Sequence, residues 1–234
     1  THKYNPTEIP YKANIWALRS LGVRWIIAPS AVGSLKEQIR PLDIVIPDQF
    51  IDRTHHRPAT FFNEGVVAHV NMGDPFCQTL SSMVGDISEK NITGGRQLHR
   101  GGTYLAMEGP AFSTRAESNL YRQWGCSIIG MTNHTEARLA KEAEIAYASL
   151  SMVTDYDCWH QNHKEVSVGM IINNLRVNAE VANKIIFEAA QLIDKERPQS
   201  LSHDSLKDGL ITSKNNVSKE TKSKVKIFTD NYWL

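Results

Sequence analysis

Short apolar runs alternate with amphipathic segments along most of the chain. The apolar runs have about the length of buried strands, and they cover residues 23–28, 42–47, 102–110, 127–131 and 146–155. Segments of helical character separate them, at residues 10–22, 77–90, 114–125, 135–145 and 168–193, the last as one long helix or a helix pair. Strands that alternate with helices in this way predict a three-layer α/β domain.

Two regions depart from this alternation. Residues 53–75 are rich in proline and glycine and predict an irregular connection. Beyond residue 195 the chain is polar, rich in lysine and poor in apolar anchors, which predicts a mobile tail over 196–234 whose end can dock on the domain. We therefore expect one domain over residues 1–195, followed by this tail.

The composition is typical of a soluble globular protein, with 41% apolar and 22% charged residues. A net charge of +1 argues against nucleic acid or an anionic membrane as the main partner. No apolar run approaches the roughly 20 residues that span a bilayer, and the opening residues lack the apolar core of a signal peptide. Three scattered cysteines without CxxC spacing fit a reducing compartment, so we expect a cytoplasmic protein, with the nucleus left open as a second location.

Four segments after predicted strands could carry chemistry, because ligands in open α/β sheets bind beyond the carboxyl ends of strands. These segments are residues 30–34, 107–114, 131–135 and 154–159.

The first of them, "PSAVGS" at residues 29–34, is rich in small residues. An anion could therefore approach its backbone amides and the hydroxyls of Ser30 and Ser34. The alternative is a tight turn between a strand and a helix, without a ligand. Thr132, after another predicted strand, could bind the same anion or could simply cap the next helix.

Asp155 and Asp157 stand two positions apart at the end of an apolar run, so strand geometry places both side chains on one side. Two like charges at this spacing cost free energy unless a ligand uses them. They could bind a metal ion, or they could hold a heterocycle that carries a donor group and a ring nitrogen to be protonated. No EF-hand or HExxH pattern accompanies them, and the nearby His160 and His163 lack a supporting pattern.

Several segments taken together resemble a known family. They are "YKANIWALRSLG", "SAVGSL", "GDPFC", "EGPAFSTRAES", "GMTNHTEARLAKEAEIAYASL" and "TDYDCW". Their order and spacing over residues 2–195 resemble the methylthioadenosine-cleaving branch of the trimeric purine nucleoside phosphorylase family. The resemblance implies a three-layer α/β/α fold with a mixed central sheet, and a homotrimer. It also implies a pentosyltransferase of purine and methionine salvage, in which phosphate converts 5'-methylthioadenosine into adenine and 5-methylthioribose 1-phosphate. Phosphate is then a co-substrate, and neither a metal nor an organic cofactor is expected.

The same resemblance implies roles for individual residues. Asp155 would protonate or hydrogen-bond N7 of the leaving base, and Asp157 would accept a hydrogen bond from its 6-amino group. The residues implied to bind phosphate are Ser30, Ala31 and Thr132. The residues implied to contact the base, the ribose or the 5' substituent are Phe112, Ile129, Met131, Val168, Ile171, His2 and His69, the last reaching into a neighbouring subunit.

Relatives specific for 6-oxopurines are the nearest alternative. They carry an asparagine where this chain has Asp155, a glutamate where it has Ser113, and a histidine near the 5'-hydroxyl where it has Val168. These three differences favour a 6-amino base and an apolar 5' substituent.

Members of this family begin with a strand and a "GGTG"-like loop and later carry an "RHG" motif, all of which contribute to phosphate binding. This chain begins after both, with His2 just past the second motif. One hypothesis is therefore an incomplete part of an active phosphorylase, whose sheet would show an unpaired edge. A second is a truncated, inactive homologue that binds nucleoside or subunits without turnover. A third is a 6-aminopurine nucleoside phosphorylase, or a nucleoside hydrolase that uses water. Phosphate dependence of turnover would separate the hydrolase from a phosphorylase.

Overall fold

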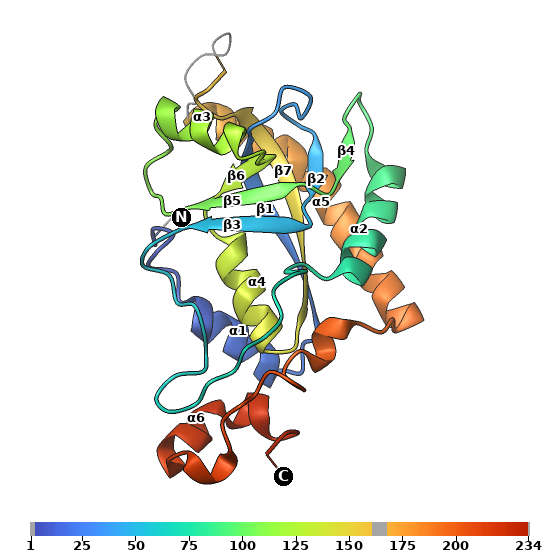
Figure 1. Ribbon diagram of the computed structural model, residues 1–234. Coiled ribbons are helices and arrows are strands. Elements are labelled where there is room, and N and C mark those ends of the chain that lie inside the picture. The colour runs from blue at the N-terminus through green and yellow to red at the C-terminus, as the bar shows by residue number, and fades with distance from the viewer. Residues whose placement is uncertain (1–2, 161–167, 234) are drawn as a thin grey trace.

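The computed structural model describes residues 3–160 and 168–233, and it contains a seven-stranded mixed sheet with helices on both faces (Figure 1). The strands lie in the order β3-β5-β6-β1-β7-β2-β4. Their bounds are β1 (Trp25–Ser34), β2 (Ile44–Ile46), β3 (Gln49–Arg53), β4 (Leu98–Arg100), β5 (Thr103–Met107), β6 (Ile128–Gly130) and β7 (Ala146–Tyr156). The helices are α1 (Tyr11–Ser20), α2 (Gln78–Asn91), α3 (Arg115–Gln123), α4 (Asn133–Glu142), α5 (Val168–Glu196) and α6 (Lys219–Thr229). The predicted α/β/α fold with a mixed central sheet is confirmed.

The centre of the sheet is the pair β1 and β7. These strands are parallel, in a register that runs from Trp25 opposite Ala146 to Ser34 opposite Tyr156. β1 pairs antiparallel with β6, and β7 pairs antiparallel with β2, so the sheet is mixed. Side chains of β7 are buried from Ala146 through Asp155, because helices cover both faces of this strand.

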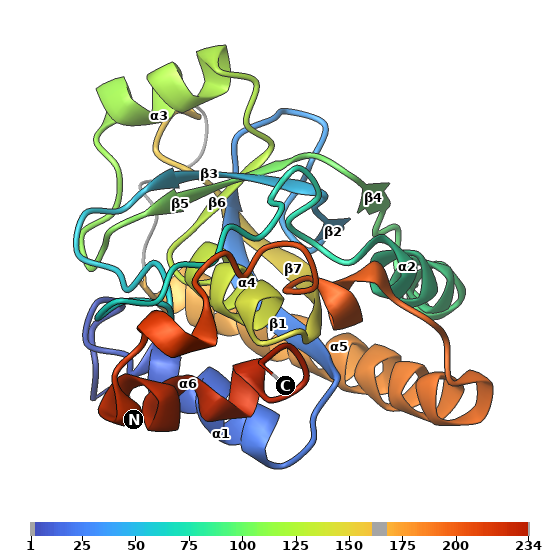
Figure 2. The same cartoon turned by 60° about the horizontal axis from the view of Figure 1, so that its bottom comes forward.

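Alternate side chains of the two central strands enter opposite core layers. Ile26 and Tyr147 pack on the side of α1 and α4, whereas Ile27 and Ala148 pack on the side of α2 and α5. This is the period of two expected for strands that are buried on both faces. α2 and α5 lie side by side on their face of the sheet (Figures 1 and 2).

Two local predictions about the sheet were wrong. Residues 29–34, expected as a loop, belong to β1, because they continue to pair with β7 past a bulge between Val32 and Gly33. The proline and the small residues of this segment are typical of a loop. The segment is nevertheless a strand, because β7 supplies its backbone hydrogen bonds. β3 and β4 were not predicted, since they are short and polar and are defined by pairing with β5 and β2.

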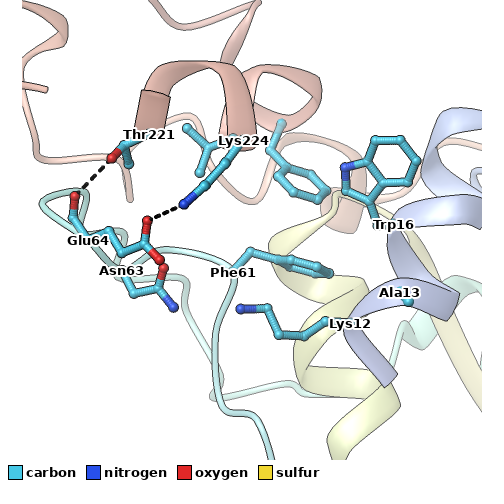
Figure 3. A pocket seen from close by; sticks show the side chains of 10 residues that line it. Lys12, Ala13, Trp16, Phe61, Asn63, Glu64, Thr221 and Lys224 are labelled. Atoms are coloured by element: carbon cyan, nitrogen blue, oxygen red, sulfur yellow. Dashed lines mark hydrogen bonds and ion pairs between the residues drawn. The ribbon is translucent and has the colours of Figure 1, made fainter. Parts of the chain in front are cut away.

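The C-terminal segment differs from the predicted mobile tail. After α5 the chain forms two short 3₁₀ turns and α6, and it adds Leu206, Val217, Val225 and Phe228 to the core layer of α1 and α4. The ring centroids of Phe228 and Phe61 lie 4.5 Å apart, and both residues line a pocket between α6 and α1. Figure 3 shows Phe61 in this pocket, with Lys12 and Trp16 of α1. Helical spacing of a few apolar residues was enough for this packing, despite the polar composition.

Polar contacts also fasten this segment to the domain. Lys224 Nζ lies 2.7 Å from Glu64 Oε2, and the Thr221 hydroxyl donates to the Glu64 carbonyl at 3.2 Å (Figure 3). The buried Glu144, just after α4, accepts a hydrogen bond from the Tyr232 hydroxyl. The expected docking of the chain end is therefore observed, while the domain division at residue 195 stays a prediction. Among the described helices, none has the length and hydrophobicity that a bilayer span requires.

Candidate active site

A cavity of about 720 Å³ lies at the carboxyl ends of β1 and β7. Its walls come from the N-terminal residues 3–6, the end of β1, the loop after β5, the junction of β6 and α4, and the end of β7. A volume of this size is in the range that holds a small organic ligand of nucleoside size. Segments far apart in the chain therefore meet at one place.

The open edge of β1 contributes one wall. β6 pairs with β1 at Gly33 and Ser34. On the side away from β7, the described part of the chain provides no strand neighbour for β1 between Trp25 and Val32. Residues 29–33 of β1 line the cavity beside this edge.

Most of the predicted site residues come together in this cavity. Those that line it are Ser30, Ala31, Phe112, Ile129, Met131, Thr132, Asp155 and Asp157. His69 does not line it: this residue is exposed, and its amide donates to the Gly209 carbonyl at 2.8 Å. His2 lies outside the described residues, and so do the side chains of Val168 and Ile171, whose backbone forms the start of α5.

Asp155 is a buried carboxyl group with one strong internal contact. Its side chain is 6% exposed, and its Oδ2 accepts a hydrogen bond of 2.6 Å from the Thr154 hydroxyl. Burial raises the pKa of Asp155 to about 6, the nearby charge of Asp157 adds to the rise, and the hydrogen bond from Thr154 opposes it. Near neutral pH this group can therefore carry a proton and donate it.

Asp157 directly follows Tyr156, the last residue of β7. Its amide donates to the Ser34 carbonyl at 3.1 Å, which keeps the side chain next to Asp155 on the cavity wall. Burial raises the pKa of Asp157. Its Oδ2 atom is buried and has no hydrogen-bond partner among the described residues. A buried acceptor without a donor is costly, so this atom is suited to receive a donor group from a ligand.

Ser30, Ala31 and Thr132 form a part of the cavity wall that is suited to an anion, called here the anion seat. Thr132 lines the cavity at the N-cap position of α4, where its side chain makes no capping hydrogen bond; its hydroxyl donates instead to Asn133 Oδ1 at 3.4 Å. The alternative prediction, in which this side chain caps the helix, is wrong. The N-terminus of α4 carries the positive end of the helix dipole toward the cavity. Ser30 and Ala31 line the cavity beside it.

Ser34 does not take the role that the sequence left open. Its hydroxyl donates to the Lys36 carbonyl at 2.8 Å and accepts a hydrogen bond from the Lys36 amide, so it stabilises the turn after β1. The residue is fully buried and does not line the cavity. No group of three metal-ligating side chains occurs in the described part of the chain, so the pair Asp155 and Asp157 has no third ligand there.

Arg57 is a site residue that sequence analysis missed, because it lies in the region predicted to be irregular. Its side chain is 2% exposed. It donates to the Met131 carbonyl at 2.7 Å, to the Tyr11 hydroxyl at 2.9 Å and to the Glu108 carbonyl at 2.5 Å. Arg57 therefore ties the cavity residue Met131 to α1 and to the loop after β5.

Glu108 completes this network. Its carboxylate lies 3.4 Å from the Arg57 guanidinium and accepts hydrogen bonds from the Thr7 hydroxyl and the amides of His55 and His56. Although partial burial raises the pKa of Glu108, these hydrogen bonds and the charge of Arg57 hold it at about 2. Neither residue lines the cavity, but together they hold its N-terminal wall in place. No sequence pattern predicts the contact between Arg57 and Glu108, because the two residues are far apart in the chain.

A mixed sheet between helices, with a buried acid pair and an anion seat at its strand ends, defines an α/β enzyme that acts on a small polar ligand. Residues 1–191 match the family model described as "Phosphorylase superfamily". The chain belongs to this superfamily.

Several proteins described as methylthioadenosine phosphorylases are similar to this chain. The chain is 66% identical to an S-methyl-5'-thioadenosine phosphorylase of Prochlorococcus marinus, over 99% of this chain and 74% of that protein. It is 51% identical to the protein of that name from Thermosynechococcus vestitus, over 99% and 80% of the two chains. A crystal structure of a methylthioadenosine phosphorylase from an antarctic soil metagenomic library matches with a TM-score of 0.92 and 49% identity, over 97% of this chain and 79% of that one. A methylthioadenosine phosphorylase from Schistosoma mansoni in complex with adenine matches with a TM-score of 0.80 and 35% identity, over 83% and 73% of the two chains.

Proposed function

We propose that this protein is a pentosyltransferase that cleaves 5'-methylthioadenosine with phosphate, giving adenine and 5-methylthioribose 1-phosphate. The observation that carries the proposal is the occurrence of two buried carboxyl groups and an anion seat in one cavity. The names of similar proteins, up to 66% identical over nearly the whole chain, support the same substrate.

The acid pair has a direct role in the departure of the base. The bond between C1' and N9 breaks, and its electron pair moves onto the purine while a phosphate oxygen bonds to C1'. Asp155 donates its proton to N7 and so neutralises the negative charge that develops on the ring. Asp157 accepts a hydrogen bond from the 6-amino group through the oxygen that has no partner among the described residues.

Phosphate binds at the other part of the cavity. The hydroxyls of Ser30 and Thr132, with the backbone at Ala31, hold its oxygens at the N-terminus of α4. The bound phosphate also stabilises the positive charge that develops on the ribose in the transition state. No metal or organic cofactor takes part in this scheme.

The remaining predicted residues shape the nucleoside site in this proposal. Phe112 stacks on the base, next to Ile129, and Met131 lies under the ribose. The start of α5, with Val168 and Ile171, accepts the methylthio group, and His2 lies near the 5' end of the substrate. His69 completes the site of a neighbouring subunit in a homotrimer, and the protein acts in the cytoplasm. The exposed position of His69 outside its own cavity supports a contact with another subunit.

The test is the release of adenine from 5'-methylthioadenosine by the purified protein, with and without phosphate. We expect adenine to form in proportion to phosphate, together with the sugar 1-phosphate. Release without phosphate, with free 5-methylthioribose as the second product, would identify a hydrolase instead. Absence of release, although 5'-methylthioadenosine binds, would identify a homologue without turnover.

Asp157→Asn is expected to reduce kcat/KM for 5'-methylthioadenosine by about 10- to 100-fold, because a hydrogen bond to a charged group contributes about 1.5–3 kcal/mol. The loss should be smaller for the analogue with a 6-oxo base, since the asparagine amide can donate to that oxygen. Steady-state kinetics with both substrates measures the difference. The matched control is Asp86→Asn, which changes an exposed carboxylate paired with Arg100. An equal loss of kcat/KM for the two substrates would contradict the role of Asp157 as the hydrogen-bond acceptor of the 6-amino group.

A further inference from the structure

Tyr104 is a buried residue directly under the anion seat that no predicted role includes. It lies on β5, opposite Ile128 of β6, and it is 0% exposed. The Tyr104 ring packs in an apolar cluster with Val32 and Val153 of the two central strands. A buried tyrosine needs a hydrogen-bond partner for its hydroxyl, and the partners of this one belong to the cavity wall.

The hydroxyl of Tyr104 extends beneath Gly130, where β6 turns into α4. A Cβ atom at Gly130 would lie 2.1 Å from the Tyr104 hydroxyl oxygen, so this position can hold only glycine while the tyrosine keeps its place. The hydroxyl accepts a hydrogen bond of 3.4 Å from the Thr132 amide. It therefore reaches the backbone of the residue whose side chain lines the anion seat.

The neighbourhood of this hydroxyl includes both sides of the anion seat. Burial raises the pKa of Tyr104, and the amides of Thr132 and Asn133 and the Ser30 hydroxyl oppose the rise. Ser30 comes from β1, and the two amides come from the start of α4.

The Thr132 side chain does not act as an ordinary helix cap. An N-cap side chain normally accepts a hydrogen bond from the first amides of its own helix, because those amides lack a partner within the helix. At α4 the cap side chain makes no such bond; the Thr132 hydroxyl donates to Asn133 Oδ1 at 3.4 Å, and the Thr132 amide donates to the Tyr104 hydroxyl. The Thr132 side chain is therefore not engaged by the amides of its own helix.

We propose that Tyr104 is a positioning residue for phosphate: its hydroxyl binds the Thr132 amide and so holds Thr132 in the arrangement in which its side chain binds the anion. The identity of the anion as phosphate rests on the proposed function. Tyr104 itself is buried and does not touch the substrate. Its removal should therefore weaken the binding of phosphate and leave the binding of the nucleoside unchanged.

Tyr104→Phe removes the hydroxyl and keeps the ring in the apolar cluster. One hydrogen bond of ordinary strength corresponds to a change of about tenfold, so we expect KM for phosphate to rise about tenfold and KM for 5'-methylthioadenosine to change less than twofold. Thermal unfolding with increasing phosphate, without nucleoside, measures the binding of phosphate independently of turnover. Tyr232→Phe is the matched control, because it removes a hydroxyl that binds the buried Glu144 outside the cavity wall.

Weaker phosphate binding in Tyr104→Phe, with the control unchanged, supports the positioning role. An unchanged dependence on phosphate overturns it, and so does an equal loss of affinity for phosphate and nucleoside, which would indicate a general structural role. If the wild-type protein binds phosphate but does not release adenine, the proposed function fails, while the comparison of phosphate binding between wild type and variant still decides the role of Tyr104.

If Tyr104→Phe does not fold, fluorotyrosine labelling of the wild-type chain replaces it, with the other six tyrosines assigned by single phenylalanine substitutions. A phosphate-dependent shift of the remaining resonance supports the proposal, and its absence overturns it.

Discussion

Replacing Asp155 by asparagine will lower kcat for adenine release by about 10²–10⁴-fold, because general acid catalysis by a positioned group contributes a factor of this size. The asparagine keeps the volume of the side chain and loses the proton that the purine takes up at N7. Steady-state rates of adenine release at saturating phosphate and nucleoside measure the loss. A variant with activity within a few-fold of wild type would show that Asp155 is not the proton donor.

The pH dependence of turnover gives an independent reading of the same group. The pKa of Asp155 is about 6, so the fraction of the protein with the proton in place falls as the pH rises through that value. We expect kcat/KM of the wild-type protein to decrease on the alkaline side of about pH 6 for this reason, and the residual activity of Asp155→Asn to lack this decrease. A decrease that persists in the variant would assign the titration to another group.

The same substitution should stabilise the protein against unfolding. The pKa of Asp155 is raised from 3.8 to about 6 in the folded chain, so its ionised form is unfavourable in the folded state. This cost is absent below about pH 4, where both states are protonated, and it is complete above about pH 6. Asp155→Asn is thus expected to add about 2–3 kcal/mol to the free energy of unfolding at neutral pH, a gain that disappears as the pH falls toward 4. Urea unfolding at the two pH values measures it.

Replacing Arg57 by methionine will lower the free energy of unfolding by at least about 3 kcal/mol and will also reduce turnover. The substitution removes the donor for the carbonyls of Met131 and Glu108 and for the Tyr11 hydroxyl. Each buried acceptor left without a partner costs about 1–3 kcal/mol, and the Glu108 carboxylate also loses its cation. Because the Met131 carbonyl is released, the wall of the cavity should loosen, and KM for the nucleoside should rise.

Arg197→Met is the matched control for Arg57. The guanidinium of Arg197 is 85% exposed and lies 3.9 Å from Asp194, so its loss should change the free energy of unfolding by less than about 1 kcal/mol. Urea unfolding of the two variants and of the wild-type protein, with nucleoside kinetics for each, provides the comparison. Equal stability of the two variants would contradict the role of the network of Arg57 and Glu108.

The sequence identified the features that depend on neighbours along the chain. The strand before Asp155 and Asp157 was visible as an apolar run, and the spacing of two between the acids placed both on one side. The helix that starts after Thr132 was predicted within two residues of its observed start. The family resemblance then connected these local patterns to a reaction, which the similarity to the phosphorylase superfamily supports over residues 1–191.

Other features depend on contacts between residues that are distant in the chain, and these appear only in the tertiary structure. The loop predicted at residues 29–34 is a strand, because β7, more than 100 positions away, supplies its hydrogen bonds. Arg57 binds a carbonyl 74 positions further on, and Tyr104 binds an amide 28 positions further on. No periodicity marks such contacts, since each depends on where the sheet brings two segments together. Local patterns along the chain were therefore enough to predict the class of fold and the acid pair, whereas packing between distant segments sets how the anion seat and the cavity walls are held.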